Sequence, residues 1–115
     1  NVAIGQGALE TNVAADKNVA VGYGSLRVAT KATTADTYNT AVGYNSGREV
    51  TSGEANTILG ALAGDAITTG NHNIAIGYQA LSAEDAGQRS VAIGSFSLSS
   101  QNVDGLTYRC SYYWC

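Results

Sequence analysis

Carboxylates are the residues of this chain best suited to acid–base chemistry, but they are scattered. Nine Asp and Glu residues are spread over 115 positions, and the single histidine, His72, lies between two asparagines. A Ser-His-Asp grouping would have to use that histidine. The adjacent pair Glu84 and Asp85 would point to opposite sides of an extended segment, so we expect both in a solvated connector. The sequence therefore predicts no catalytic residue and no enzyme.

The two cysteines, Cys110 and Cys115, lie close together near the end of the chain. Two thiols without a nearby histidine are too few ligands for zinc, and neither a phosphate-binding glycine loop nor a calcium-roll motif occurs. We therefore expect no metal and no cofactor. In an oxidising compartment a disulfide is expected, within one chain or between chains, and the spacing does not choose between them.

The residues around these cysteines are unusually aromatic, with Tyr108, Tyr112, Tyr113 and Trp114 in the last eight positions. A tail over 107–115 of this kind is typical of a cap that covers the open end of a repeat array. It is also typical of a contact surface for a neighbouring subunit or a sugar, because Tyr and Trp are enriched at binding hot spots. A foreign tail is the third interpretation.

A nine-residue segment, repeated six times, organises the rest of the chain. The copy at 73–81 reads NIAIGYQAL, and the copies begin at residues 1, 18, 39, 56, 73 and 90. These starts are 17 residues apart except for one spacing of 21, so the connector 27–38 holds a four-residue insertion. Such a period is typical of a solenoid, in which each coil buries its apolar face only against its neighbours. The sequence predicts one repeat domain over 1–106.

Each copy alternates branched and small residues, which is typical of a β-strand. The second and fourth positions are Val, Ile, Leu or Thr, whereas the third is Ala except at Ile58. We expect the branched side chains to lie inside the coil and the Ala side to face a second chain. A later small residue followed by Leu or Gly, such as Ala80 and Leu81, predicts a second short strand that returns across the coil.

Three other positions recur between copies. Glycine at the fifth position suits a corner with positive φ or little room, and asparagine at the first suits a ladder of amide hydrogen bonds between coils. Tyrosine after the glycine would form a column that serves either packing or contact with a sugar or cell surface. The corners are Gly5, Gly22, Gly43, Gly60, Gly77 and Gly94, the ladder is Asn1, Asn18, Asn39, Asn56 and Asn73, and the column is Tyr23, Tyr44 and Tyr78.

Charge is sparse and confined to the connectors. Charged residues make up 13% of the chain, the formal net charge is −3, and all of them fall outside the six repeated segments. Six scattered basic residues cannot follow a phosphate backbone, so nucleic acid is not an expected partner. No apolar run approaches the roughly 18 residues of a membrane helix, so membrane insertion is not expected either.

Residues 90–94, SVAIG, and the copies at 1–5, 18–22 and 73–77 resemble the head repeats of trimeric autotransporter adhesins and related repeats of phage tail and other surface fibres. The resemblance covers about residues 1–106. It implies a left-handed parallel β-roll in which three chains wrap about one axis and display an adhesive surface. The connectors are longer here than in adhesin heads, which is closer to fibre proteins. Residues 107–115 fall where a seventh unit would start but do not match the repeat.

We therefore expect an all-β parallel β-solenoid of six coils of about 17 residues, left-handed and stacked against other copies of the chain. As function we expect a structural segment of an extracellular fibre, adhesin head or phage tail fibre. It would be a homotrimer that presents a contact face to a cell-surface glycan or protein. The alternative is the subunit of a self-assembling extracellular filament, because the chain begins in phase with the repeat and would expose an unpaired strand edge.

Overall fold

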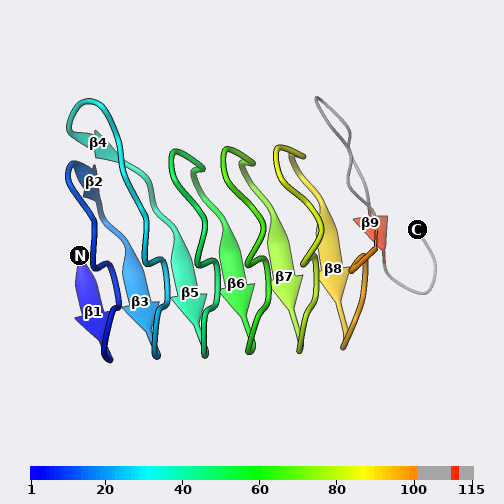
Figure 1. Ribbon diagram of the computed structural model, residues 1–115. Helices are drawn as coiled ribbons and strands as arrows, with labels where there is room; N and C mark the ends of the chain where they lie inside the picture. Colours follow the sequence, from blue (N-terminus) through cyan, green and yellow to red (C-terminus); the bar gives the residue numbers. More distant parts are fainter. Residues whose placement is uncertain (101–109, 112–115) are drawn as a thin grey trace.

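The computed structural model describes residues 1–100 and Cys110–Ser111, and all of the regular elements there are short parallel strands. Figure 1 shows them side by side along one axis, with the chain looping back between successive strands. The main sheet has seven strands in the order β1-β3-β5-β6-β7-β8-β9. Its strands are β1 Val2–Ile4, β3 Val19–Val21, β5 Thr40–Val42, β6 Thr57–Leu59, β7 Ile74–Ile76, β8 Val91–Ile93 and β9 Cys110–Ser111.

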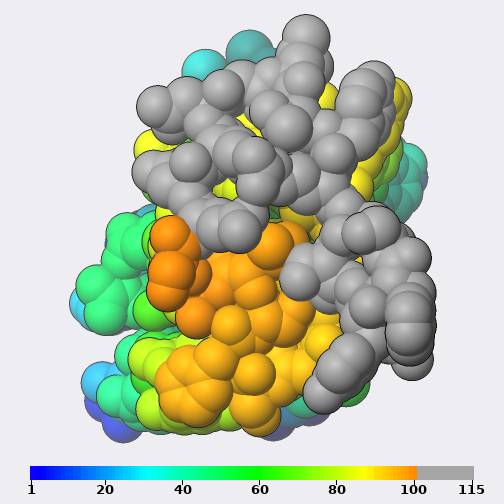
Figure 2. Space-filling model, turned by 90° about the vertical axis from the view of Figure 1, so that its right-hand side faces the viewer, coloured from blue at the N-terminus to red at the C-terminus, as the bar shows by residue number. Residues whose placement is uncertain are grey.

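The first six strands of this sheet are the starts of the six predicted repeats, stacked in register. Val2 pairs with Val19, Ile74 pairs with Val91, and the second position of every copy falls in one column. An end-on view shows the last described coil, in orange, lying over the earlier coils (Figure 2). The prediction of an all-β parallel solenoid is confirmed, and its six stacked strands are joined by five turns of chain.

The four-residue insertion builds a second, two-stranded sheet beside the main one, in which β2 (Ala15–Asp16) pairs in parallel with β4 (Ala35–Asp36). Lys17 Nζ lies 2.7 Å from Asp36 Oδ2, and the Tyr38 hydroxyl donates to the same oxygen at 2.9 Å. The hydrogen bond from Lys17, followed by that from Tyr38, lowers the pKa of the Asp36 carboxyl. The insertion therefore lengthens the second coil and leaves the main stack in register.

The strands face the opposite way from the prediction. From the second coil on, the side chains of the third position point into the coil and are completely buried, whereas the branched side chains point outward. In β7, Ala75 is completely buried whereas Ile74 is 36% exposed, and in the first coil Ala3 is exposed together with Val2 and Ile4. The interior is narrow because it must also hold side chains from the turns and connectors, so in most coils only a methyl group fits beneath the strand. The buried third-position residues are Ala20, Ala41, Ile58, Ala75 and Ala92, and the other large core residues are Leu26, Val50, Ile67 and Leu81.

Ile58, the one large residue in the alanine column, is accommodated by glycines across the coil. A Cβ on Gly47 would lie 2.8 Å from Ile58 Cδ1, and a Cβ on Gly64 would lie 3.3 Å from the same atom. Gly47 and Gly64 are the ninth residues of their copies, and the ninth residue of the other four copies is leucine, at Leu9, Leu26, Leu81 and Leu98. The core volume is thus conserved by exchanging a large residue on one wall for a large residue on the other.

The predicted second strand is instead a run of turns. After each corner glycine, alternate residues adopt positive φ, as at Gln79 (52°) and Leu81 (55°). Backbone in the left-handed region cannot form an extended strand. The turns nevertheless hydrogen-bond from coil to coil, because the N–H of Leu81 donates to Ser97 O at 2.8 Å and the N–H of Gly64 donates to Ala80 O at 2.8 Å.

The backbone of β9 continues the main sheet, with Cys110 beside Val91 and Ser111 beside Ala92. Residues 101–109 and 112–115 are outside the described part of the chain. The predicted contact role of Tyr112, Tyr113 and Trp114 and the predicted disulfide between Cys110 and Cys115 therefore stay predictions.

Candidate functional site

The corner glycines combine an unusual backbone conformation with very close approach between coils. All six have φ between 116° and 137°. A Cβ on Gly77 would lie 2.7 Å from the carbonyl carbon of Gly94 and 3.0 Å from the amide nitrogen of Ser95. Both atoms belong to the backbone of the next coil and cannot rotate away. These glycines therefore determine how closely successive coils stack.

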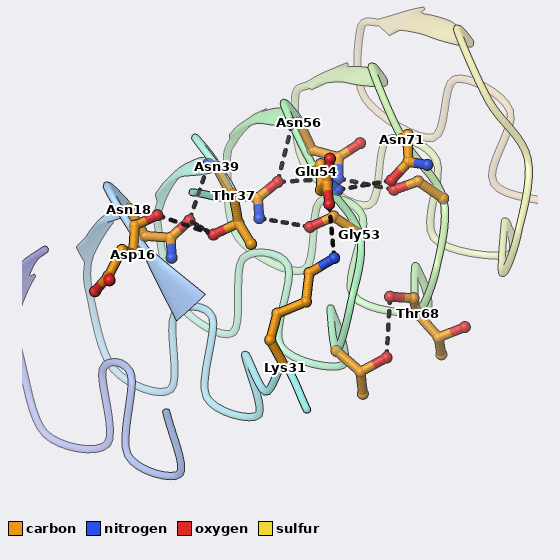
Figure 3. Close-up of polar contacts among 12 residues, drawn as sticks. Asp16, Asn18, Lys31, Thr37, Asn39, Gly53, Glu54, Asn56, Thr68 and Asn71 are labelled. Atoms are coloured by element: carbon orange, nitrogen blue, oxygen red, sulfur yellow. Dashed lines mark hydrogen bonds and ion pairs between the residues drawn. The ribbon is translucent and has the colours of Figure 1, made fainter. Parts of the chain in front are cut away.

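The asparagine side chains form a polar ladder along the stack that is exposed at Asn1 and buried from Asn18 to Asn73 (Figure 3). The Oδ1 atom of Asn56 accepts a hydrogen bond from the backbone N–H of Asn73 at 2.9 Å. Its Nδ2 atom donates to Gly70 O at 2.9 Å and to Asn39 Oδ1 at 3.0 Å. Asn56 is completely buried, so these contacts satisfy a polar group that water does not reach. Most links run from side chain to backbone, and Asn56 to Asn39 is an amide-to-amide contact.

The ladder changes at Asn18, where the insertion displaces the connector. The Oδ1 atom of Asn18 accepts hydrogen bonds from the Thr37 hydroxyl at 2.7 Å and from the N–H of Asn39 at 2.9 Å. Its Nδ2 atom is buried and has no hydrogen-bond partner in the described part of the chain. In the coils that follow, the equivalent Nδ2 reaches a glycine carbonyl, as Asn39 reaches Gly53 O at 2.8 Å. The insertion therefore leaves one polar atom of the core unsatisfied.

The outward side chains of the main sheet form a continuous apolar surface that we call the outer strip. It has two columns in register, contains no charged residue, and carries threonine in two copies. Leu59 is 47% exposed and Ile93 is 42% exposed. The strip consists of Val2, Val19, Thr40, Thr57, Ile74 and Val91 in one column and Ile4, Val21, Val42, Leu59, Ile76 and Ile93 in the other. An exposed, contiguous apolar surface of this kind is typical of a protein contact site.

Aromatic rings that follow the corner glycines contact one another between successive coils, but the column of rings is interrupted. Tyr23 and Tyr44 lie in successive coils with their rings stacked, at 5.5 Å between centroids and 13° between planes. Ala61 follows in the next coil, and Tyr78 then meets Phe96 edge-on at 5.4 Å. About half of the surface of each stacked ring is exposed. The column is therefore two separate aromatic pairs.

A hollow of ≈ 160 Å³ adjoins the first of these pairs, lined by Gln6, Gly7, Glu10, Tyr23, Gly24 and Arg27. Glu10 and Arg27 form an ion pair across it, with Arg27 Nε 2.5 Å from Glu10 Oε2. This pair was not among the residues predicted to form a site. The signal was present, because residues 10 and 27 hold the same place in two successive repeats and must lie side by side once the coils stack.

One carboxylate lies in an environment that differs from the prediction. Glu84 is 1% exposed, not solvated, and its Oε1 accepts a hydrogen bond from the N–H of Gly87 at 2.8 Å. It occupies the place that Val50 and Ile67 hold in the two preceding repeats. Burial also raises the pKa of the Asp65 carboxyl. Among the described residues, no three His, Cys, Asp or Glu side chains lie together in a way that would hold a metal ion.

No family model, curated protein or solved structure compared with the chain matches it. None of the described segments forms a helix of the length and apolar character needed to cross a bilayer. The repeat geometry and the surfaces described above are therefore the basis for inferring a function.

Proposed function

We propose that this chain is a structural segment of an extracellular fibre, adhesin head or phage tail fibre, whose copies associate through the outer strip. The observation that carries the proposal is the exposure of in-register branched side chains along the stack. When the Val, Ile and Leu side chains of the strip are removed from water, each Å² of apolar surface contributes about 25 cal/mol of favourable free energy. A chain that stays alone does not gain this free energy. A second copy of the chain offers a matching surface of the same period.

The dimensions of the strip favour three copies over a face-to-face pair. Its two columns are about 7 Å apart, and six stacked strands span about 24 Å. The resulting footprint of roughly 170 Å² is well below the ~800 Å² per partner of a stable interface. Around a three-fold axis each copy contacts two neighbours and also buries the flanks of its coils. This is the arrangement that the resemblance to adhesin heads and fibre repeats implies. With the outer strip buried between copies, the turns and connectors would remain on the outside to contact a cell-surface glycan or protein.

A mass measurement on matched variants tests the proposal. By light scattering, we expect the wild-type chain to have three times the monomer mass of 11.8 kDa. Ile76→Asp places a carboxylate in the outer strip and should reduce the mass to that of one chain. Val13→Asp is the control, because Val13 is 80% exposed and lies in a connector outside the strip.

Three outcomes of this experiment have distinct meanings. A wild-type mass that grows with concentration, together with visible fibres, would favour the self-assembling filament. An Ile76→Asp mass equal to that of the wild type would exclude the outer strip as the interface. A wild-type chain that stays a monomer at every concentration would reject both forms of the proposal.

A further inference from the structure

The stack of Tyr23 on Tyr44 ends abruptly at the first coil. Tyr44 covers one face of the Tyr23 ring, with the ring planes 13° apart. On the other side, the equivalent residue is Gln6, and the residue after it is Gly7. No ring continues the stack there, and Tyr23 lines the hollow between the first two coils together with Gln6.

Glycines keep this hollow open. Gly7 and Gly24 hold the same place in the first two repeats, whereas the next four repeats have Asn45, Leu62, Gln79 and Phe96. A Cβ on Gly7 would approach no atom of the described residues closer than 3.7 Å. The volume of ≈ 160 Å³ is similar to that of an engineered 150 Å³ cavity that accepts benzene, so one six-membered ring fits.

Polar groups with both signs of charge line the hollow beside Tyr23. Arg27 uses Nε to bind Glu10 Oε2, and each of these side chains is 49% exposed. A guanidinium has five N–H donors and a carboxylate accepts through two oxygens, so the pair has hydrogen-bonding capacity beyond this one contact. The Gln6 amide adds a donor and an acceptor. Because the charges of Glu10 and Arg27 cancel, the slot offers no net attraction to an anion.

We propose that this slot, formed by Gln6, Glu10, Tyr23 and Arg27, binds a neutral pyranose ring of a glycan. The apolar face of the sugar stacks on the free face of Tyr23, and adjacent hydroxyls bridge the carboxylate of Glu10 and the guanidinium of Arg27. A pair of neighbouring hydroxyls both donates and accepts, which matches a carboxylate beside a guanidinium. A flat aromatic ligand would use the stacking surface but would leave these polar groups without partners.

The use of this slot as a cell-surface contact rests on the proposed fibre function, whereas binding of the sugar by one chain does not. A fibre would repeat the slot on each copy, and linked weak sites of this kind gain avidity. The monomeric affinity can therefore be low while the assembled fibre still adheres.

Titration with methyl pyranosides, followed by chemical shifts of Tyr23 and Arg27, tests the assignment. We expect at least one neutral methyl pyranoside to bind. Tyr23→Ala should weaken that binding about tenfold, because an aromatic stacking contact contributes up to about 1.5 kcal/mol. Tyr23→Phe keeps the ring and should restore the affinity to within about twofold. Tyr78→Ala is the matched control, because Tyr78 holds the same repeat position beside Phe96 and should leave binding unchanged.

Several results would overturn the assignment. These are the absence of binding by every neutral pyranoside, equal binding by wild type and Tyr23→Ala, and tighter binding of nucleosides than of pyranosides. Repeating the titration on Ile76→Asp keeps this test separate from the fibre proposal. A wild-type chain that stays a monomer yet binds the sugar would count against the fibre alone, whereas a wild-type chain that assembles but binds no sugar would count against the slot alone.

Discussion

Replacing Gly77 with alanine should destabilise the stack far more than the same change at Gly94. The two residues have similar backbone conformations, with φ of 125° and 116°. Strain from placing a Cβ at such an angle costs about 1–3 kcal/mol at either position. At Gly77 the Cβ would also lie 2.7 Å from the carbonyl carbon of Gly94, whereas at Gly94 it meets no atom of the described residues within 4 Å.

The clash at Gly77 adds a second cost that can be separated from the strain. Relieving it requires the two coils to move apart, which stretches the hydrogen bond from the N–H of Gly94 to Ile76 O, now 2.7 Å long. Overpacking of this kind costs about 1–3 kcal/mol, so Gly77→Ala should lose about 2–6 kcal/mol of unfolding free energy in total. Gly77→Val, with a branched side chain, should lose more.

Urea unfolding at one fixed protein concentration measures this difference. Gly77→Ala should have a lower midpoint than Gly94→Ala with an unchanged m-value, corresponding to about 1–3 kcal/mol between the two variants. Equal losses at the two positions would show that strain alone acts at these corners. A neutral Gly77→Ala would show that the corner geometry is wrong.

Three further sets of substitutions test the core and its polar groups by thermal or urea unfolding. Ile58→Ala should lower the free energy of unfolding by about 2–5 kcal/mol and Gly64→Leu by about 1–3 kcal/mol. The double variant should recover part of this loss, because the leucine fills the volume that the isoleucine leaves, and simply additive losses would contradict the proposed exchange of volume. Asn56→Ala should cost about 2–4 kcal/mol because it orphans buried backbone groups, and Asn18→Ala should cost less because Asn18 Nδ2 already lacks a partner in the described part of the chain. Asp65→Asn should stabilise at neutral pH by less than about 1 kcal/mol, because burial raises the pKa of this carboxyl and so penalises its charged form. That gain should shrink as the pH falls through the raised folded-state pKa, where the native carboxyl becomes protonated, and a gain independent of pH would contradict the cause given.

The stacking of the coils followed from the period of the sequence. Once the starts at 1, 18, 39, 56, 73 and 90 were aligned, the partners of each strand were determined, including Val2 beside Val19. The asparagine and glycine positions were found in the same way. In each case the residue type and its repetition carried the information, because only glycine tolerates the corner and an amide both donates and accepts.

The direction in which the strands face could not be read from the alternation. Period-two patterning separates two faces, but it does not say which face is inside when one is branched and the other is alanine. The outcome depends on how much room the returning chain leaves, and Leu26 and Leu81 from the turns already fill that space. The prediction assigned the larger residues to the inside, which holds for wide cores and fails for a coil this narrow.

The predictions of a second strand and of a solvated Glu84 were wrong because each was made from local sequence alone. Leucine at positive φ is unfavourable in isolation, so nothing in the sequence predicts φ of 55° at Leu81. Glu84 looks like an ordinary connector residue until it is aligned with Val50 and Ile67, which hold the same place in the repeat and are buried. Comparison across repeats would have placed it in the core.

The most direct test of the central claim is whether residues on the outer strip of different chains lie close together in solution. In a chain with Cys110→Ser and Cys115→Ser, a short bifunctional maleimide should link Ile76→Cys chains into covalent dimers in high yield. Ala75→Cys, one residue away but inside the coil, and Val13→Cys, in an exposed connector, should give little product. A yield from Ile76→Cys no higher than that from Val13→Cys would contradict association through the outer strip.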